Sequence, residues 1–247
     1  MFNLLKWATG ALITATLVAC GGGSDSGSAA PGAPAVPSAP VASTETFAFK
    51  TAYVNLVTAS QTKTFKISAS GAGQSVSGSG TVIFGGLAPA TFEGRTALTR
   101  SISVSGSLTD NGQAIAFPSS SSNEYYDSSY NPLGASDGTE YAFIDNNPPS
   151  IPQTVKVGGS GVMYTFIRYN SSTKNTLLGT SVYSYVVEPD TAMTALVTIV
   201  ETVKDTAGKV TETTSSVFRI TPSGGASLVK ETATDLDTNV ILTATYN

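Results

Sequence analysis

Apolar and polar residues alternate along most of the chain that follows residue 46. Phe65, Ile67 and Ala69 alternate with threonine, lysine and serine, and residues 76–84 and 98–108 continue the pattern. A period of two places the apolar side chains on one face of a β-strand, and threonine and serine suit the solvated face. No segment after residue 46 carries a sustained apolar stripe of helical period, so the pattern predicts strands and no helix.

Further strands are predicted in the last part of the chain. They span residues 162–169, 176–187, 192–204, 209–221, 226–235 and 239–246. Because short turns connect them, we predict an all-β fold: an antiparallel meander that forms a curved sheet, a half-barrel or a barrel. Gly-Ser-Gly occurs at 78–80 and at 159–161, each time before an apolar strand. This leaves two readings open, a fold of two related halves or a coincidence in a glycine-rich chain.

One hairpin can be predicted together with its register. Asn111-Gly112 is a strong signal for a two-residue turn in which both positions have positive φ. Folding the chain about this turn sets Leu108 opposite Ile115 and Gly106 opposite Phe117. Apolar positions of one strand then meet apolar positions of the other, so pattern and turn agree.

Residues 118–153 break the alternation. Serine runs, Asn131-Pro132, Asp137-Gly138 and Pro148-Pro149 are all turn or loop signals. We therefore predict a long central loop. It divides the body into an N-terminal β half, residues 46–153, and a C-terminal β meander, residues 154–247.

The first residues have the order of an export signal. Lys6 precedes a short apolar segment, and Leu17-Val18-Ala19-Cys20 resembles the lipobox of bacterial lipoprotein precursors. The resemblance implies a signal peptide over residues 1–19 and attachment of lipid, including palmitate, to Cys20. Residues 20–45 are rich in Gly, Ser, Ala and Pro and form a predicted flexible tether.

Gly21 bears on where such a lipoprotein resides. In the Gram-negative sorting rule, aspartate directly after the acylated cysteine marks retention in the inner membrane, and here glycine stands in its place. The resemblance therefore implies a lipid-anchored protein of the outer membrane, facing the periplasm or the cell surface. Its membrane contact is through the N-terminal lipid.

The amino-acid composition argues against several classes of function. The chain has 13 basic and 17 acidic residues and no basic stripe, so we expect no nucleic-acid partner. It has no histidine and a single cysteine, so it cannot assemble a Ser-His-Asp or Cys-His nucleophile. We expect no catalytic residue, no metal site and no cofactor; the Asp and Asn clusters lack the spacing of an EF-hand loop.

A tyrosine-rich segment is the candidate binding site. Tyr125, Tyr126 and Tyr130 surround Asp127 in the predicted central loop. Exposed rings there suit stacking on sugars or docking to a protein, with Asp127 accepting hydrogen bonds from hydroxyls. The alternative is that the rings fold back and cover an end of the sheet.

The segment 125–134 also resembles part of an uncharacterised family of Gram-negative lipoproteins. Residues 91–94 and 185–191 carry the same resemblance. It implies a lipid-tethered all-β domain and names no function.

The leading hypothesis is a non-enzymatic accessory or binding module with an envelope glycan or a protein as partner. One alternative is a carrier that holds a hydrophobic ligand in a half-barrel. Another is a glycan hydrolase based on two carboxylates. Glu201 faces Glu212 if the loop at 205–208 has two or four residues, whereas a three-residue loop with Gly208 left-handed sets Glu201 opposite Thr213.

The lipobox assignment generates the first prediction. Cys20→Ser should abolish labelling by fatty acid and leave the precursor uncleaved or the protein soluble, because each buried methylene of an acyl chain contributes roughly 0.8 kcal/mol to membrane binding. Metabolic labelling and membrane fractionation check this. A cleaved Cys20→Ser protein that still fractionates with membranes would refute it.

Overall fold

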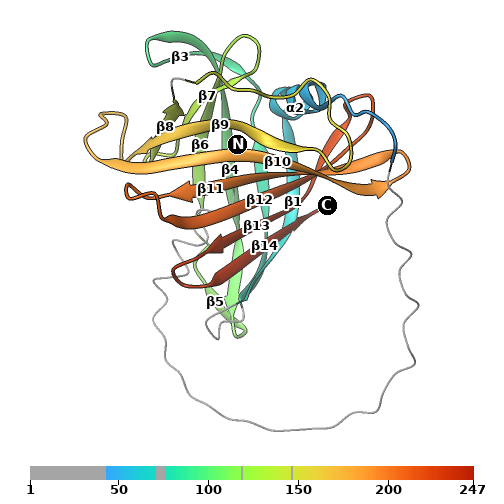
Figure 1. Cartoon of the computed structure of the whole chain (residues 1–247). Helices are drawn as coiled ribbons and strands as arrows, with labels where there is room; N and C mark the ends of the chain where they lie inside the picture. Colours follow the sequence, from blue (N-terminus) through green and yellow to red (C-terminus); the bar gives the residue numbers. More distant parts are fainter. Residues whose placement is uncertain (1–42, 71–75, 118, 146) are drawn as a thin grey trace, which may run out of the picture.

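Antiparallel strands and one helix make up the regular structure of the computed structural model, which describes residues 43–70, 76–117, 119–145 and 147–247 (Figure 1). The helix is α2 (Phe49–Thr58). The strands are β1 (Gln61–Ser70), β2 (Val76–Phe84), β3 (Ala88–Phe92), β4 (Arg95–Asp110), β5 (Gln113–Ile115), β6 (Ser120–Tyr126), β7 (Pro132–Ser136), β8 (Tyr141–Ile144), β9 (Ser160–Tyr169), β10 (Leu177–Thr191), β11 (Thr194–Lys204), β12 (Val210–Ile220), β13 (Ala226–Asp235) and β14 (Val240–Tyr246). The predicted signal peptide and Cys20 lie outside the described residues.

Twelve of the strands close into a barrel. The first strand pairs with the last, with Phe65 opposite Tyr246, and β2 pairs with β4, with Val82 opposite Val104. The remaining strands, β3 and β5, pair with β4 only. Figure 1 shows β9–β14, in yellow to red, crossing steeply in front of β1, β4 and β6. The predicted all-β antiparallel fold is confirmed, and among its three forms the barrel is the one observed.

The two sequence halves form adjoining arcs of this one barrel. They meet where β8 pairs with β9 and where β1 pairs with β14. The main hydrophobic core draws on both halves, including Phe65 and Leu108 from the first and Tyr183 and Leu242 from the second. The arcs therefore share one core.

Alternation of side chains follows the prediction in most strands. Every second residue of β11 is buried from Ala195 to Val203. The predicted hairpin at Asn111-Gly112 is also present: Leu108 lies opposite Ile115, and Asn111 and Gly112 have φ of 48° and 79°. The ladder ends at Ile115, so the predicted pairing of Gly106 with Phe117 is a contact with the phenyl ring and not a strand pair.

The predicted long central loop is wrong. The short strands β6, β7 and β8 lie within it and complete the barrel wall between β4 and β9. Small polar residues such as Ser122 face the interior there, so the apolar alternation that reveals other strands is missing. These strands form through backbone pairing with their neighbours: β6 with β4, β7 with β6 and β8, and β8 with β9.

The structure also contains a helix that the sequence analysis excluded. Phe49, Ala52, Tyr53, Leu56 and Val57 are the buried face of α2, at the i, i+3, i+4, i+7 and i+8 positions. No side chain caps its N-terminus and no acidic residue lies in its first turn, so the usual start signals are missing. In the described ranges no helix has the length and hydropathy needed to cross a membrane.

The hairpin between β11 and β12 decides between the registers left open above. Asp205 and Lys209 pair around a three-residue loop in which Gly208 has φ of 84°. An added bulge at Val203/Lys204 then sets Glu201 opposite Thr214, one residue beyond the expected Thr213. Glu201 and Glu212 therefore do not face each other across the ladder.

Candidate functional site

Buried charges line part of the barrel interior. Arg100 of β4 is 3% exposed and donates hydrogen bonds to Glu124 of β6 (Nη2–Oε2, 2.5 Å) and to the carbonyl of Leu56 in α2 (Nη1–O, 2.7 Å). The Tyr126 hydroxyl also donates to Glu124. Burial alone would raise the pKa of Glu124, but the charge of Arg100 and these hydrogen bonds lower it to about 2. This cluster ties the last turn of α2 to the barrel wall.

A second buried carboxyl belongs to Glu231 of β13. It accepts hydrogen bonds from the Tyr246 hydroxyl and from Ser216 (Oγ–Oε1, 3.0 Å). Burial outweighs these hydrogen bonds and raises the pKa of Glu231 to about 7. With 4% of its surface exposed, the residue lies too deep to meet an external ligand without opening the barrel.

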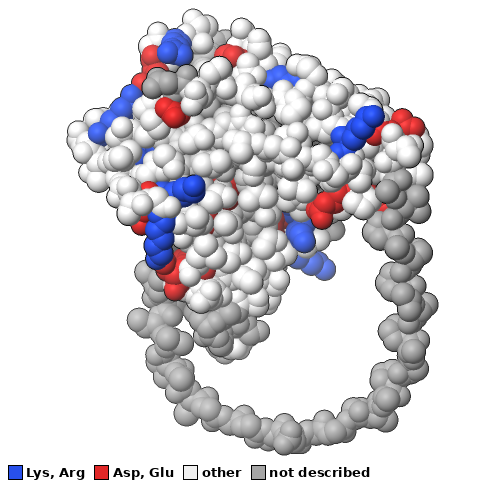
Figure 2. Space-filling model, viewed as in Figure 1, with Lys and Arg blue, Asp and Glu red and all other residues white. Residues whose placement is uncertain are grey.

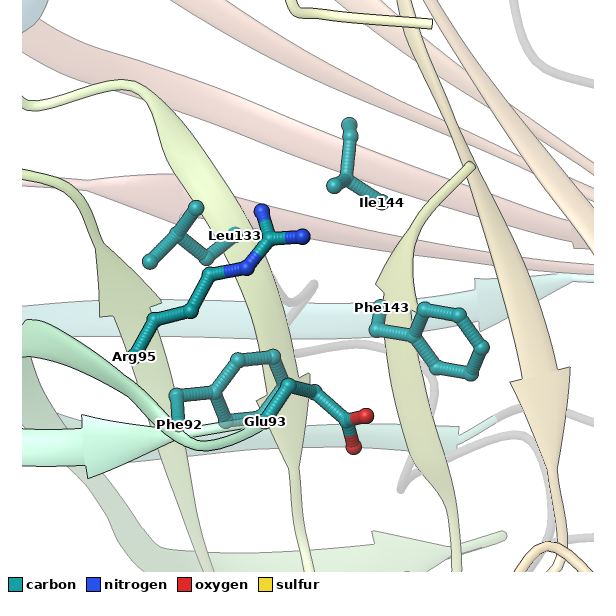
Figure 3. Close-up of a pocket in the computed structure, with 6 residues that line it drawn as sticks. All are labelled: Phe92, Glu93, Arg95, Leu133, Phe143 and Ile144. Atoms are coloured by element: carbon teal, nitrogen blue, oxygen red, sulfur yellow. The ribbon is translucent and has the colours of Figure 1, made fainter. Parts of the chain in front are cut away.

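An open pocket lies at the β3–β4 hairpin. Its volume is about 170 Å³, and we call it the outer pocket. Its lining residues come from the hairpin and from β7 and β8 (Figure 3): Phe92, Glu93, Arg95, Leu133, Phe143 and Ile144. The pocket thus combines apolar walls with two charged side chains.

Aromatic rings form the walls of the outer pocket and continue beyond it. Phe92 stacks on Tyr125 with centroids 4.3 Å apart, and Phe143 stacks on Tyr169 at 5.9 Å. Tyr141 contacts both Phe92 and Phe143. Ring contacts therefore run without a break from Tyr125 through Phe92, Tyr141 and Phe143 to Tyr169, and these five residues form one continuous aromatic cluster.

Gly134 of β7 allows the hairpin to approach the barrel wall. A Cβ atom at this position would lie 2.3 Å from the Phe92 ring and 2.3 Å from the carbonyl oxygen of Ala142. Real Cβ atoms do not approach other atoms so closely. Glycine at 134 is therefore a steric requirement for the seating of Phe92 and, with it, for the outer pocket.

The turn at the tip of the hairpin places a charge where glycine or asparagine is usual. Glu93 and Gly94 connect β3 to β4 with φ of 51° and 70°. Such turns favour Asn-Gly or Asp-Gly, and a left-handed glutamate is strained by comparison. The turn alone does not account for glutamate at position 93.

The partners of Glu93 account for it better. Its carboxylate accepts hydrogen bonds from Tyr141 (Oη–Oε1, 2.5 Å) and from Lys174 (Nζ–Oε2, 2.5 Å). Lys174 is also left-handed, with φ of 57°, and its ammonium lies 4.3 Å from the centroid of Phe143. Partial burial would raise the pKa of Glu93, but Lys174 and Tyr141 hold it below its ordinary value. Two strained residues therefore meet in one ion pair at the rim of the pocket.

The predicted binding residues do not form one surface. Tyr125 and Tyr126 lie in β6 and not in a loop, and their rings point to opposite sides of the barrel wall. Tyr126 is 1% exposed, and Tyr130 packs partly buried against the core. The carboxylate of Asp127 binds Asn131 and the backbone of its own turn. Only Tyr125 reaches the aromatic cluster, because strand pairing with β4 alternates the two neighbouring rings.

Sequence reasoning missed the residues of the outer pocket. One local signal was present: glutamate before glycine in a hairpin turn, at Glu93-Gly94. Its partner Lys174 lies 81 positions away, and nothing in the sequence links the two. No group of three or more Asp, Glu, Cys or His side chains with metal-site geometry occurs among the residues that the structure describes.

Charge on the visible face of the molecule is sparse. Figure 2 shows a largely uncharged surface over β9–β12, with Lys and Arg close to Asp and Glu around its margins. The two signs are mixed there, so this face carries no extended patch of positive charge.

Comparisons with known proteins give little beyond the geometry. No protein-family model matches the chain, and no curated protein sequence matches it. Among solved structures, it is similar to the crystal structure of a DUF1329 family protein from Desulfovibrio piger, with a TM-score of 0.34 and 10% sequence identity. The match covers 81% of this chain and 92% of that protein. A likeness this weak carries no inference about function.

Burial of Tyr126 generates a stability prediction. Tyr126→Ala should lower the free energy of unfolding by about 3–5 kcal/mol, as for other large-to-small changes in a core. Tyr126→Phe should cost about 1–3 kcal/mol, because it keeps the ring and removes only the hydroxyl that binds Glu124. Urea denaturation of both variants measures the difference. Wild-type stability in Tyr126→Ala would contradict this placement of the ring.

Glu231 generates a prediction for pH. Below its ordinary pKa of 4.5 the carboxyl is protonated in both states; between 4.5 and about 7 only the unfolded state loses the proton. Stability should therefore fall by about 3 kcal/mol as pH rises through this window. Glu231→Gln should remove that slope in denaturation curves, whereas Glu188→Gln, which neutralises an exposed carboxylate, should keep it. An unchanged slope in Glu231→Gln would show that another group causes it.

Proposed function

We propose that this protein is a non-enzymatic binding module of the bacterial cell envelope, held at the outer membrane by a lipid on Cys20. The lipobox resemblance of Leu17-Val18-Ala19-Cys20, followed by Gly21, supports the location. In this proposal the barrel faces the periplasm or the cell surface. It binds a small ligand, or one residue of an envelope glycan or protein, in the outer pocket.

The observation that carries the proposal is the strained ion pair of Glu93 and Lys174. Left-handed backbone at a residue other than glycine costs roughly 1–2 kcal/mol. An ion pair as exposed as this one returns about 0–1 kcal/mol. The Tyr141 hydrogen bond adds about 0.5–1.5 kcal/mol, and the contact of Lys174 with the Phe143 ring adds about 0.5–1 kcal/mol. These contacts at most offset the strain of two left-handed residues, so stability alone is a weak reason to keep both. Placement of their charged groups beside apolar pocket walls is a better one, because binding sites combine such walls with a few fixed polar groups.

The carrier alternative requires an interior that accepts a hydrophobic ligand. The barrel interior instead holds Arg100, Glu124 and Glu231, each with polar partners. A hydrocarbon chain next to these groups would have to displace their hydrogen bonds, at a cost of about 1–3 kcal/mol for each group left unsatisfied. The interior therefore favours the binding module over the carrier.

The hydrolase alternative requires carboxylates that reach a substrate. A general acid must come within hydrogen-bond distance of the atom it protonates. Glu231 has the raised pKa of such an acid, but Tyr246 and Ser216 enclose it inside the barrel. In the outer pocket, Glu93 is ionised and already bound by Lys174 and Tyr141. This chemistry favours binding over hydrolysis.

Removal of one pocket wall tests the proposal. Phe143→Ala should weaken the binding of ring-sized probes by about tenfold or more, since burying an aromatic ring contributes roughly 1.5–3 kcal/mol. Benzyl alcohol, glucose and benzoate are suitable probes, titrated against the protein and followed by NMR shifts of the β7 and β8 amides.

Ile83→Ala is the matched control, because Ile83 is an exposed apolar residue of β2, on another part of the barrel. It should bind the probes as the wild type does. If no probe shifts the pocket amides, or if both variants bind equally well, the outer pocket is not a binding site.

A further inference from the structure

We propose that the ligand of the outer pocket is an organic monocarboxylate with one compact apolar ring, and that Arg95 binds its carboxylate. This inference rests on the proposed function and names the class of ligand. The chemistry could belong to a free ring-bearing acid or to the C-terminal residue of a peptide with an aromatic side chain.

Arg95 is the cation that lines the outer pocket. It is exposed at the start of β4, and Figure 3 shows its guanidinium reaching across the pocket between Leu133 and Ile144. Within the described ranges its guanidinium makes no hydrogen bond or ion pair, although its charge helps to lower the pKa of the nearby Glu93 carboxyl. A guanidinium offers two parallel N–H donors that match the two oxygens of a carboxylate. The free donors therefore point to a planar anion.

The neighbouring charges favour an anion with a single charge. Arg95 and Lys174 are positive and Glu93 is negative, so these three groups together carry one positive charge. Lys174 and Tyr141 hold the Glu93 carboxylate from two sides, and it makes no ion pair with Arg95. A phosphate dianion would leave these groups with a net negative charge, and Glu93 would repel it more strongly than it repels a singly charged carboxylate. One carboxylate balances the charge.

The walls of the outer pocket determine the apolar part of the ligand and its size. Phe92, Leu133, Phe143 and Ile144 offer apolar surface next to the guanidinium. The pocket volume of about 170 Å³ is smaller than the roughly 300–1,000 Å³ of sites for drug-sized molecules. It has room for one ring and not for a long chain. Contact with these walls is needed as well, because an exposed ion pair alone binds weakly in water.

Isosteric probes test this inference in the full chain. Benzoate and benzamide have the same shape and differ in charge, so benzoate should bind at least about tenfold more tightly if Arg95 reads the carboxylate. Arg95→Gln should reduce benzoate binding to the level of benzamide and leave benzamide unchanged. Lys66→Gln, which removes one positive charge from an exposed position of β1, should leave both unchanged. Titration followed by NMR or calorimetry gives the affinities.

The outcomes separate this inference from the proposed function. Equal binding of benzoate and benzamide, or benzoate binding unaffected by Arg95→Gln, overturns carboxylate recognition and leaves a binding pocket for neutral rings. Competition by inorganic phosphate as strong as that by benzoate also overturns it, because the site is then a general anion site. Failure of every ring to bind removes the binding function itself.

A second pair of probes distinguishes the two sources. N-acetyl-phenylalanine represents a peptide C-terminus, and its amide is the neutral control. Tighter binding of N-acetyl-phenylalanine than of benzoate, lost in Arg95→Gln, assigns the site to peptide C-termini. Tighter binding of benzoate assigns it to free acids. Loss of preference for the acid over the amide in both pairs overturns the inference.

Discussion

Because β2 pairs with β4 as well as with β1, each of the twelve barrel strands is hydrogen-bonded on both sides and its backbone is satisfied. Closure also shields the interior from water, so every polar group inside needs a partner there. Arg100 forms a hydrogen-bonded ion pair with Glu124 and also donates hydrogen bonds to the carbonyl groups at the end of α2. A helix with weak local signals is in this way held by a side chain of the barrel.

The sequence predicts the barrel wall where local pattern and tertiary structure agree. Alternation in β11 and the Asn111-Gly112 turn are set by residues next to each other in the chain, and both are observed. β6 was missed because distant residues determine it. The residues of α2 do carry a short apolar stripe of helical period, from Phe49 to Val57, but no capping side chain or acidic residue marks where the helix begins. Arg100 binds the last carbonyls of the helix, and β4 supplies the backbone partners of β6. Ser122 faces the interior without the apolar character that marks a buried position.

Of the candidate site, only the hairpin turn could be recognised from the sequence. Glu93-Gly94 is an unusual hairpin-turn sequence. The role of Glu93, however, depends on its ion pair with Lys174, which lies in the β9–β10 connection. The sequence predicts that Tyr125 and Tyr126 lie in a loop. They lie in β6 instead, so the ring of Tyr126 points into the core and the ring of Tyr125 packs in the aromatic cluster. The sequence gives no sign that Gly134 is required, because the requirement comes from the Phe92 ring that packs against it in the folded structure. Sites assembled from separate strands are visible only once the strands are in register.

Pairing of β1 with β14 has a consequence for how the chain acquires its structure. Each strand from β9 to β14 pairs with the next one along the chain, so these hairpins can form while the polypeptide is being synthesised. Phe65 pairs with Tyr246, so the barrel stays open until β14 has been synthesised. Contacts so distant along the chain fold slowly, because a long loop has to close before they form. During that interval the edges of β1 and β13 lack their final neighbour and can pair with other chains. The barrel is therefore most prone to aggregation just before β14 takes its place between β13 and β1.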